Sequence, residues 1–283
     1  MKYRCFDMKH GEKKKKKIRR LIIILLVFLG LSVWSWVPFR ENFKVSLKDE
    51  GSYGIRMVLI TDLHSCYYGK GQKSLISKIE KEEPDMIMLG GDIFDDKLGD
   101  KNAELLLQSL ADKYPCFYVT GNHEFWSGRA DEIKEYLESI GVTVLAGDCK
   151  TIEKNGVFLD ICGVDDPTDM TTMEWKKQLD AAYAKTQESH VRILLSHRPE
   201  KVSVYEEYDF DLILSGHAHA GQFRIPIINR GLYAPDQGFM AKYVDGTYKL
   251  SNGSILVVSR GLARESLFMP RFFNHPQILT IEI

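Results

Sequence analysis

Short apolar runs alternate with amphipathic stretches along the chain after residue 54. Each apolar run is five to seven residues long, which is the length of a buried strand. They predict strands over 55–61, 85–90, 116–120, 157–163, 191–196 and 211–216. The stretches between several of them repeat their apolar residues at helical spacing and predict helices over 72–83, 102–113, 131–140 and 172–184. Strands that alternate with helices indicate an α/β fold with largely parallel strand pairing.

The pattern changes after residue 220. Here the apolar runs are joined by turn-like segments, with no helical pattern between them. They predict strands over 222–226, 247–250, 255–259 and 278–283.

The N-terminal region has a different composition. Residues 21–37 contain no charged side chain, and residues 1–20 before them carry a net charge of +8. An apolar segment of this length with basic residues on its leading side is typical of a membrane anchor whose N-terminus stays in the cytoplasm. A cleaved signal peptide is the alternative, but tryptophans occupy the positions where small cleavage-site residues would stand, and this favours the anchor. The Arg19-Arg20 pair is loosely similar to a twin-arginine export signal.

These patterns divide the chain into four parts and place the main domain outside the cytoplasm. The parts are a basic cytoplasmic tail (1–20), a transmembrane anchor (21–37), a linker (38–53) and a main domain (54–283).

Charge and cysteine usage exclude several classes of protein. The residues after 37 carry a net charge of −9, which argues against a nucleic-acid-binding surface. The five cysteines are scattered and form no C-x-x-C pair, so they indicate neither a disulfide scaffold nor a zinc ribbon.

Polar side chains with metal-binding or acid–base chemistry follow five of the predicted strands. Active sites of open α/β folds gather at the carboxyl ends of strands. Any one of these residues could be a helix cap or a satisfied core histidine, but five of the eight histidines lie at these ends. The residues are Asp62 and His64, Asp92 and Asp95, Asn122 and His123, His197, and His217 and His219.

Seven of these residues are candidate metal ligands. Nitrogen and oxygen donors without cysteine suit divalent ions such as Mn²⁺, Zn²⁺ or Fe. Seven ligands exceed what one ion with open positions requires, and they suit two ions that share a bridging carboxylate. Glycines before Asp92, Asn122 and His217 would allow the backbone to approach the ions closely.

The motifs D-x-H (62–64), G-D-x-x-D (91–95), G-N-H-E (121–124), His197 and G-H-x-H (216–219) follow one another in an order that resembles the calcineurin-like metallophosphoesterases. The segment after residue 216 is similar to the membrane-anchored bacterial branch of the YkuE and YaeI type. The resemblance implies a four-layer sandwich of two mixed β-sheets flanked by helices.

The resemblance also implies a role for each motif residue. Asp62, His64 and His219 would hold one ion. Asn122, His197 and His217 would hold the other. Asp92 would bridge the two ions, Asp95 would orient a ligand, and His123 would act on the substrate as the catalytic residue.

The implied activity is the hydrolysis of phosphate esters, most of all diesters, with two divalent ions as cofactors. Two alternatives stay open: a lipid-nucleotide pyrophosphatase of the type that cleaves UDP-2,3-diacylglucosamine, and a catalytically silent ligand-binding relative. Arg198 and Arg260 are candidates to contact the ester, although surface or packing roles explain them equally well. The expected partners are the phosphate-ester substrate and the membrane.

Overall fold

The structure is a computed structural model that describes residues 14–27, 30, 39–47, 52–225, 230–264, 271 and 273–283. Residues 14–27 are helical. Within the described ranges, no helix combines the length and the apolar character needed to cross a membrane. Most of the predicted anchor, residues 28–29 and 31–37, lies outside the described residues.

The first sheet has six strands and mixes parallel with antiparallel pairing. Strand β16 pairs parallel with β1 and antiparallel with β2, while β2, β3, β4 and β5 are parallel to their neighbours. The spatial order is β1 (Phe39–Lys44), β16 (Gln277–Glu282), β2 (Arg56–Ile60), β3 (Met86–Gly90), β4 (Cys116–Val119) and β5 (Thr143–Val144).

The second sheet also has six strands. Its four inner strands are parallel, and an antiparallel strand lies at each edge. The spatial order is β14 (Gly246–Lys249), β15 (Ile255–Val258), β9 (Leu212–Ser215), β8 (Val191–Leu195), β7 (Val157–Gly163) and β6 (Asp148–Lys154).

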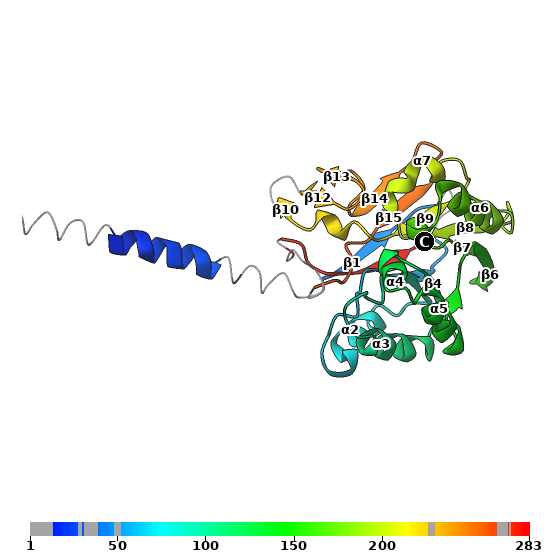
Figure 1. Ribbon diagram of the computed structural model, residues 1–283. Helices are drawn as coiled ribbons and strands as arrows, with labels where there is room; N and C mark the ends of the chain where they lie inside the picture. Colours follow the sequence, from blue (N-terminus) through cyan, green and yellow to red (C-terminus); the bar gives the residue numbers. More distant parts are fainter. Residues whose placement is uncertain are drawn as a thin grey trace, which may run out of the picture.

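Helices cover the outer faces of both sheets, with α2, α3 and α5 on one side of the molecule and α6 and α7 on the other (Figure 1). The α-helices are α2 (Lys73–Glu80), α3 (Lys101–Ala111), α4 (Asn122–Trp126), α5 (Ala130–Ser139), α6 (Thr172–Tyr183) and α7 (Val202–Tyr205). Short 3-10 turns are η1 (Lys70–Gln72), η2 (Pro167–Asp169), η3 (Pro199–Lys201) and η4 (His219–Gly221). Two small hairpins pair β10 (Arg224–Ile225) with β11 (Arg230–Gly231), and β12 (Tyr233–Ala234) with β13 (Gly238–Phe239).

Alternation along β2 shows how the layers are built. Val58 and Ile60 point into a core shared with α2 and α3, whereas Met57 and Leu59 point into the core between the two sheets. A third core packs Trp175 of α6 against the outer face of the second sheet. The order helix, sheet, sheet, helix confirms the predicted α/β fold with two mixed sheets.

Strand β1 differs from the sequence prediction. The polar composition of 38–53 predicts a linker, whereas Phe39–Lys44 form an edge strand in register with Gln277–Glu282. An edge strand pairs on one side only, so it can carry polar side chains and still belong to the sheet.

Candidate metal centre

The carboxyl ends of five strands meet at one place between the two sheets. Asp62, Asp92 and Asn122 follow β2, β3 and β4 of the first sheet, and the histidines 197 and 217 follow β8 and β9 of the second. The sequence predicts that these groups gather at the carboxyl ends of strands, and the structure brings them together from both sheets.

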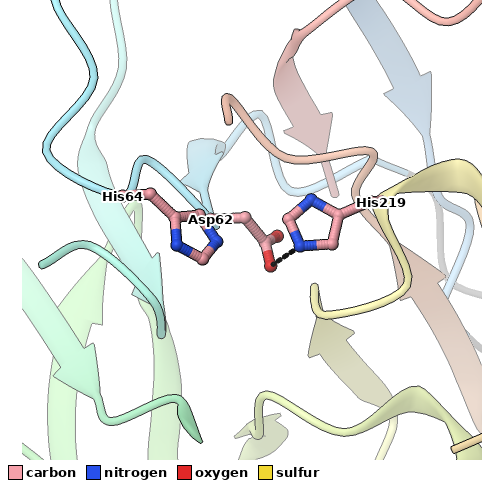
Figure 2. A group of neighbouring side chains, drawn as sticks. All are labelled: Asp62, His64 and His219. Atoms are coloured by element: carbon pink, nitrogen blue, oxygen red, sulfur yellow. Dashed lines mark ion pairs between the residues drawn. The ribbon is translucent and has the colours of Figure 1, made fainter. Parts of the chain in front are cut away.

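Asp62, His64 and His219 form the first group of candidate ligands (Figure 2). One ligand atom from each lies within 4.8 Å of the others. His219 Nε2 is 3.7 Å from Asp62 Oδ1, and the two imidazole centroids are 5.3 Å apart. In Figure 2 the imidazoles lie on either side of the carboxylate. The group matches the residues expected to hold one ion.

Asp92, His197 and His217 form a second group with the same limit of 4.8 Å. His197 Nε2 is 3.2 Å from Asp92 Oδ2, and the same oxygen is 3.6 Å from His64 Nε2 of the first group. The Asp92 carboxylate therefore lies between the two groups, where a bridging ligand is required. Asn122 begins α4 and is 2% exposed.

Several candidate ligand atoms are buried and lack a hydrogen-bond partner. They are Asp62 Oδ2, His64 Nε2, Asn122 Oδ1 and His197 Nε2. A buried polar atom without a partner costs about 1–3 kcal/mol, so a protein rarely keeps four of them at one place without a ligand. All four are nitrogen or oxygen donors of the kind that divalent ions bind. The donor set therefore fits metal ions.

Hydrogen bonds on the far side of two imidazoles fix which nitrogen is available. His64 Nδ1 lies 3.1 Å from Asp95 Oδ2, and His197 Nδ1 lies 2.8 Å from the carbonyl oxygen of Gly90. Carboxylate and carbonyl oxygens accept, so Nδ1 is the donor in both rings and Nε2 is the nitrogen left to bind a metal ion. Asp95 is thus placed where the sequence predicts a residue that orients a ligand.

The backbone at the site is strained. The angle φ is 50° at Asp62, 51° at Asp92, 64° at His217 and 45° at His219. Non-glycine residues in this left-handed region cost of order 1–3 kcal/mol each and cluster at functional sites. A Cβ on Gly121 would lie 2.2 Å from Asp92 Oδ1, so only glycine allows this close approach. The glycine before Asn122 therefore lets the backbone pack against the Asp92 carboxylate, and its role next to metal ions stays a prediction.

Asp92 and His197 shift each other's ionisation. Burial favours the neutral imidazole, yet the facing carboxylate raises the pKa of His197 to about 10. Burial also opposes ionisation of Asp92, but the facing imidazoles, His197 first, hold its pKa well below the ordinary value. The site therefore favours positive charge next to this carboxylate, and a divalent ion can take the place of that proton.

His123 lies beside the ligands on the one-and-a-half-turn helix α4. Its ring centroid is 4.2 Å from that of His64, and its Nδ1 is 2.7 Å from Asp96 Oδ1. The carboxylate accepts from Nδ1, so Nε2 is the nitrogen free to exchange a proton. The same distance limit of 4.8 Å also groups His123 with His64 and Asp95. Distance alone therefore does not separate a catalytic histidine from a metal ligand.

Glu124 is a site residue whose role sequence reasoning missed. Its buried carboxylate accepts hydrogen bonds from the backbone N–H groups of Asp92, Ile93, Phe94 and Gly121 at 2.7–3.0 Å. These bonds tie the loop after β3 to the start of α4, and so hold Asp92 next to Asn122. Its place in the G-N-H-E motif is the only sequence signal for this role.

The two arginines suggested as substrate contacts are engaged by carboxylates. Arg198 bonds Asp166 through Nε at 2.5 Å and through Nη2 at 2.9 Å. Arg260 bonds Asp245 through Nε at 3.0 Å. A substrate role for either arginine would therefore require it to share its guanidinium with these partners.

The fold and the site together define a metal-dependent phosphoesterase. The family model of the calcineurin-like phosphoesterases matches residues 55–221, and the chain belongs to this family. The family uses a dinuclear centre of divalent ions, and the clustered ligand groups agree with it. The protein is therefore a hydrolase of the phosphoesterase type, with the metal identity left open.

Three relatives show how far the similarity extends. An uncharacterised metallophosphoesterase of Helicobacter pylori is 29% identical over 90% of this chain and 68% of its own length. The phosphodiesterase YaeI of Escherichia coli is 29% identical over 81% of this chain and 82% of its own. The metallophosphoesterase YkuE of Bacillus subtilis is 28% identical over 84% and 82%. These two relatives confirm the resemblance to the YkuE and YaeI type.

Other matches are limited in coverage. The chain spans 63% of a second Helicobacter pylori relative and 53% of one from Campylobacter jejuni. The NAD nucleotidase of Haemophilus influenzae superposes with a TM-score of 0.51 and 16% identity, over 74% of this chain and 46% of that one. At this identity the match shows the fold alone.

Proposed function

We propose that the protein hydrolyses phosphodiesters with two divalent ions held by the seven candidate ligands. The observation that carries the proposal is the set of buried, unpartnered ligand atoms on both sides of Asp92. Bound divalent ions would polarise the phosphoryl group and lower the pKa of an attacking water molecule. The similarity to YaeI, which is named a phosphodiesterase, supports the diester over other esters.

His123 supplies the proton that the leaving group needs. Asp96 holds Nδ1–H, so it is the imidazolium form of His123 that would donate its second proton, from Nε2, to the leaving oxygen. Trp126 is 59% exposed and its ring lies 4.7 Å from the His123 ring, centroid to centroid. It provides a flat apolar surface next to the proton donor, which suits a leaving group with apolar or aromatic character.

The function is tested by hydrolysis of bis-p-nitrophenyl phosphate by the full-length protein in detergent. We expect nitrophenolate release with added Mn²⁺ and none after removal of metal by a chelator. The same assay with UDP-2,3-diacylglucosamine separates the alternatives. Cleavage of that diphosphate alone would favour the lipid-nucleotide pyrophosphatase, and no product from either compound with Mn²⁺, Zn²⁺ or Fe²⁺ would favour a silent binding protein.

We also propose that residues 21–37 anchor the domain to the membrane, with the active site outside the cytoplasm. Support comes from the uncharged segment after a strongly basic tail. A relative from Danio rerio, 26% identical over 75% of this chain, is named a transmembrane protein with a metallophosphoesterase domain. Strand β1 begins only two residues after the segment, so the domain would lie close to the bilayer.

The anchor predicts how the protein partitions. After an alkaline carbonate wash, the full chain is expected to stay in the membrane pellet, while a chain that begins at residue 39 is expected in the supernatant. Protease added to intact spheroplasts should then digest the domain. Release of the full chain by carbonate would contradict the anchor, and protection from protease would contradict its orientation.

A further inference from the structure

A hairpin that lies outside every recognised motif reaches into the metal centre. Strands β12 and β13 are joined by a turn that contains Asp236, with φ of 56°. The Asp236 side chain is 54% exposed, yet its Oδ2 lies 2.9 Å from His217 Nε2. A candidate ligand of the second group is thus in direct contact with a carboxylate that does not belong to either metal group.

Arg198 holds this carboxylate in place. Its Nη1 donates to the same Asp236 oxygen, while Nε and Nη2 bind the buried Asp166. Arg198 is 7% exposed and Asp166 is 1% exposed, so the guanidinium is fixed on its inner side. The hairpin turn is therefore attached to the site through Arg198, which is itself held by a buried ion pair with Asp166.

Arg198 Nη1 also lies 2.9 Å from His217 Nε2. A guanidinium can only donate, and a carboxylate can only accept. With Asp236 present, Nε2–H can donate to the carboxylate, and the lone pair is then on Nδ1. Without Asp236, the nearest group to Nε2 is the guanidinium, which would bond the lone pair of Nε2 and place the proton on Nδ1.

We propose that Asp236 is the positioning residue of His217: it sets the tautomer in which Nδ1 can bind the second metal ion, and it prevents Arg198 from setting the opposite one. The inference rests on the proposed two-metal function. Carboxylates that accept from the far nitrogen of a metal-binding histidine are known to raise metal affinity about 10–100-fold. In this chain the carboxylate comes from a half-exposed hairpin turn. Retention of the second ion therefore depends on the position of that hairpin relative to His217.

The test is a titration of the metal-free, full-length protein with Mn²⁺ in the presence of a competing chelator. Wild type is expected to bind two equivalents. The variant Asp236→Ala is expected to bind the first ion normally and the second about 10–100-fold more weakly. Asp236→Asn keeps an oxygen that can accept from Nε2, so its loss should be smaller than that of the alanine variant.

Asp209→Asn is the matched control. Like Asp236, Asp209 has a half-exposed side chain (62%) and pairs with a buried arginine, Arg192, at 2.6 Å. It differs in position, because Asp209 precedes strand β9 and His217 follows that strand. This variant should bind both ions as wild type does. If Asp236→Ala binds two ions with unchanged affinity, the inference is overturned. A lower melting temperature of the metal-free variant would then leave Asp236 with a structural role only. Fewer than two equivalents in wild type would instead contradict the proposed function.

Discussion

Replacement of Asp92 by asparagine is expected to reduce bound metal from two equivalents to fewer than one, and to abolish most turnover. Asp92 Oδ2 lies 3.2 Å from His197 Nε2 and 3.6 Å from His64 Nε2, so this oxygen faces candidate ligands of both metal groups. Metal ions supply several kcal/mol of transition-state stabilisation, which corresponds to a fall in rate on the order of 10³-fold or more. Metal analysis and kcat for bis-p-nitrophenyl phosphate measure the two effects.

Asp160→Asn is the control for this variant. Asp160 is also fully buried and lies 3.0 Å from an imidazole, that of His190, but it stands in the middle of β7 and away from the strand ends. It should retain both ions and wild-type turnover, whatever its effect on stability. An Asp92→Asn protein that keeps two ions would show that another group bridges the centre.

His123→Asn is expected to keep both metal ions and to lose most turnover. The ring bonds Asp96 through Nδ1, and Nε2 is the nitrogen from which the imidazolium would donate, so the variant loses the acid but none of the seven ligands. A positioned acid contributes about 10²–10⁴-fold, and kcat should fall by that amount with little change in KM. An ester with a much better leaving group needs less protonation, so it should lose less rate. Asp96→Asn should show a smaller loss than His123→Asn.

His190→Asn provides the comparison. His190 Nδ1 bonds Asp160 in the way that His123 Nδ1 bonds Asp96, but it lies on the opposite end of the second sheet from the ligands. Its turnover should equal that of wild type. Equal turnover in His123→Asn would remove His123 from the mechanism, and loss of metal from that variant would reassign it as a ligand.

The central strands could be predicted because they are buried on both faces. The apolar run at 85–90 became Met86–Gly90, with all five residues buried, and the run at 191–196 became Val191–Leu195, also with every residue buried. Continuous apolar runs are the pattern that such strands require. The four helices could be predicted because each has apolar residues at helical spacing on the face that packs against a sheet.

Edge elements could not be predicted from the same pattern. Strand β6 spans Asp148–Lys154 and contains no buried residue, and β1 spans the polar Phe39–Lys44. Both are fixed by pairing with distant segments, β1 with the C-terminal β16. Local sequence carries little of that information because backbone hydrogen bonds, rather than apolar side chains, hold an edge strand.

The same distinction separates the predicted site residues from the missed ones. Each candidate ligand follows a strand, so its position could be inferred once the strands were recognised. Asp236 comes from a hairpin turn whose path depends on tertiary packing. Asp166 follows β7 as the ligands follow their strands, but it belongs to none of the motifs. Glu124 is inside a motif, but only the structure shows that four backbone N–H groups converge on it.

The most direct test of the account is the metal content of the full-length protein after saturation with Mn²⁺ and removal of free metal, measured by inductively coupled plasma mass spectrometry against protein concentration. If the two sheets together hold one dinuclear centre, each chain binds two equivalents of Mn²⁺. Activity should then rise in proportion to the occupancy of the second metal site. Fewer than two equivalents at saturation, or full activity with one, would contradict it.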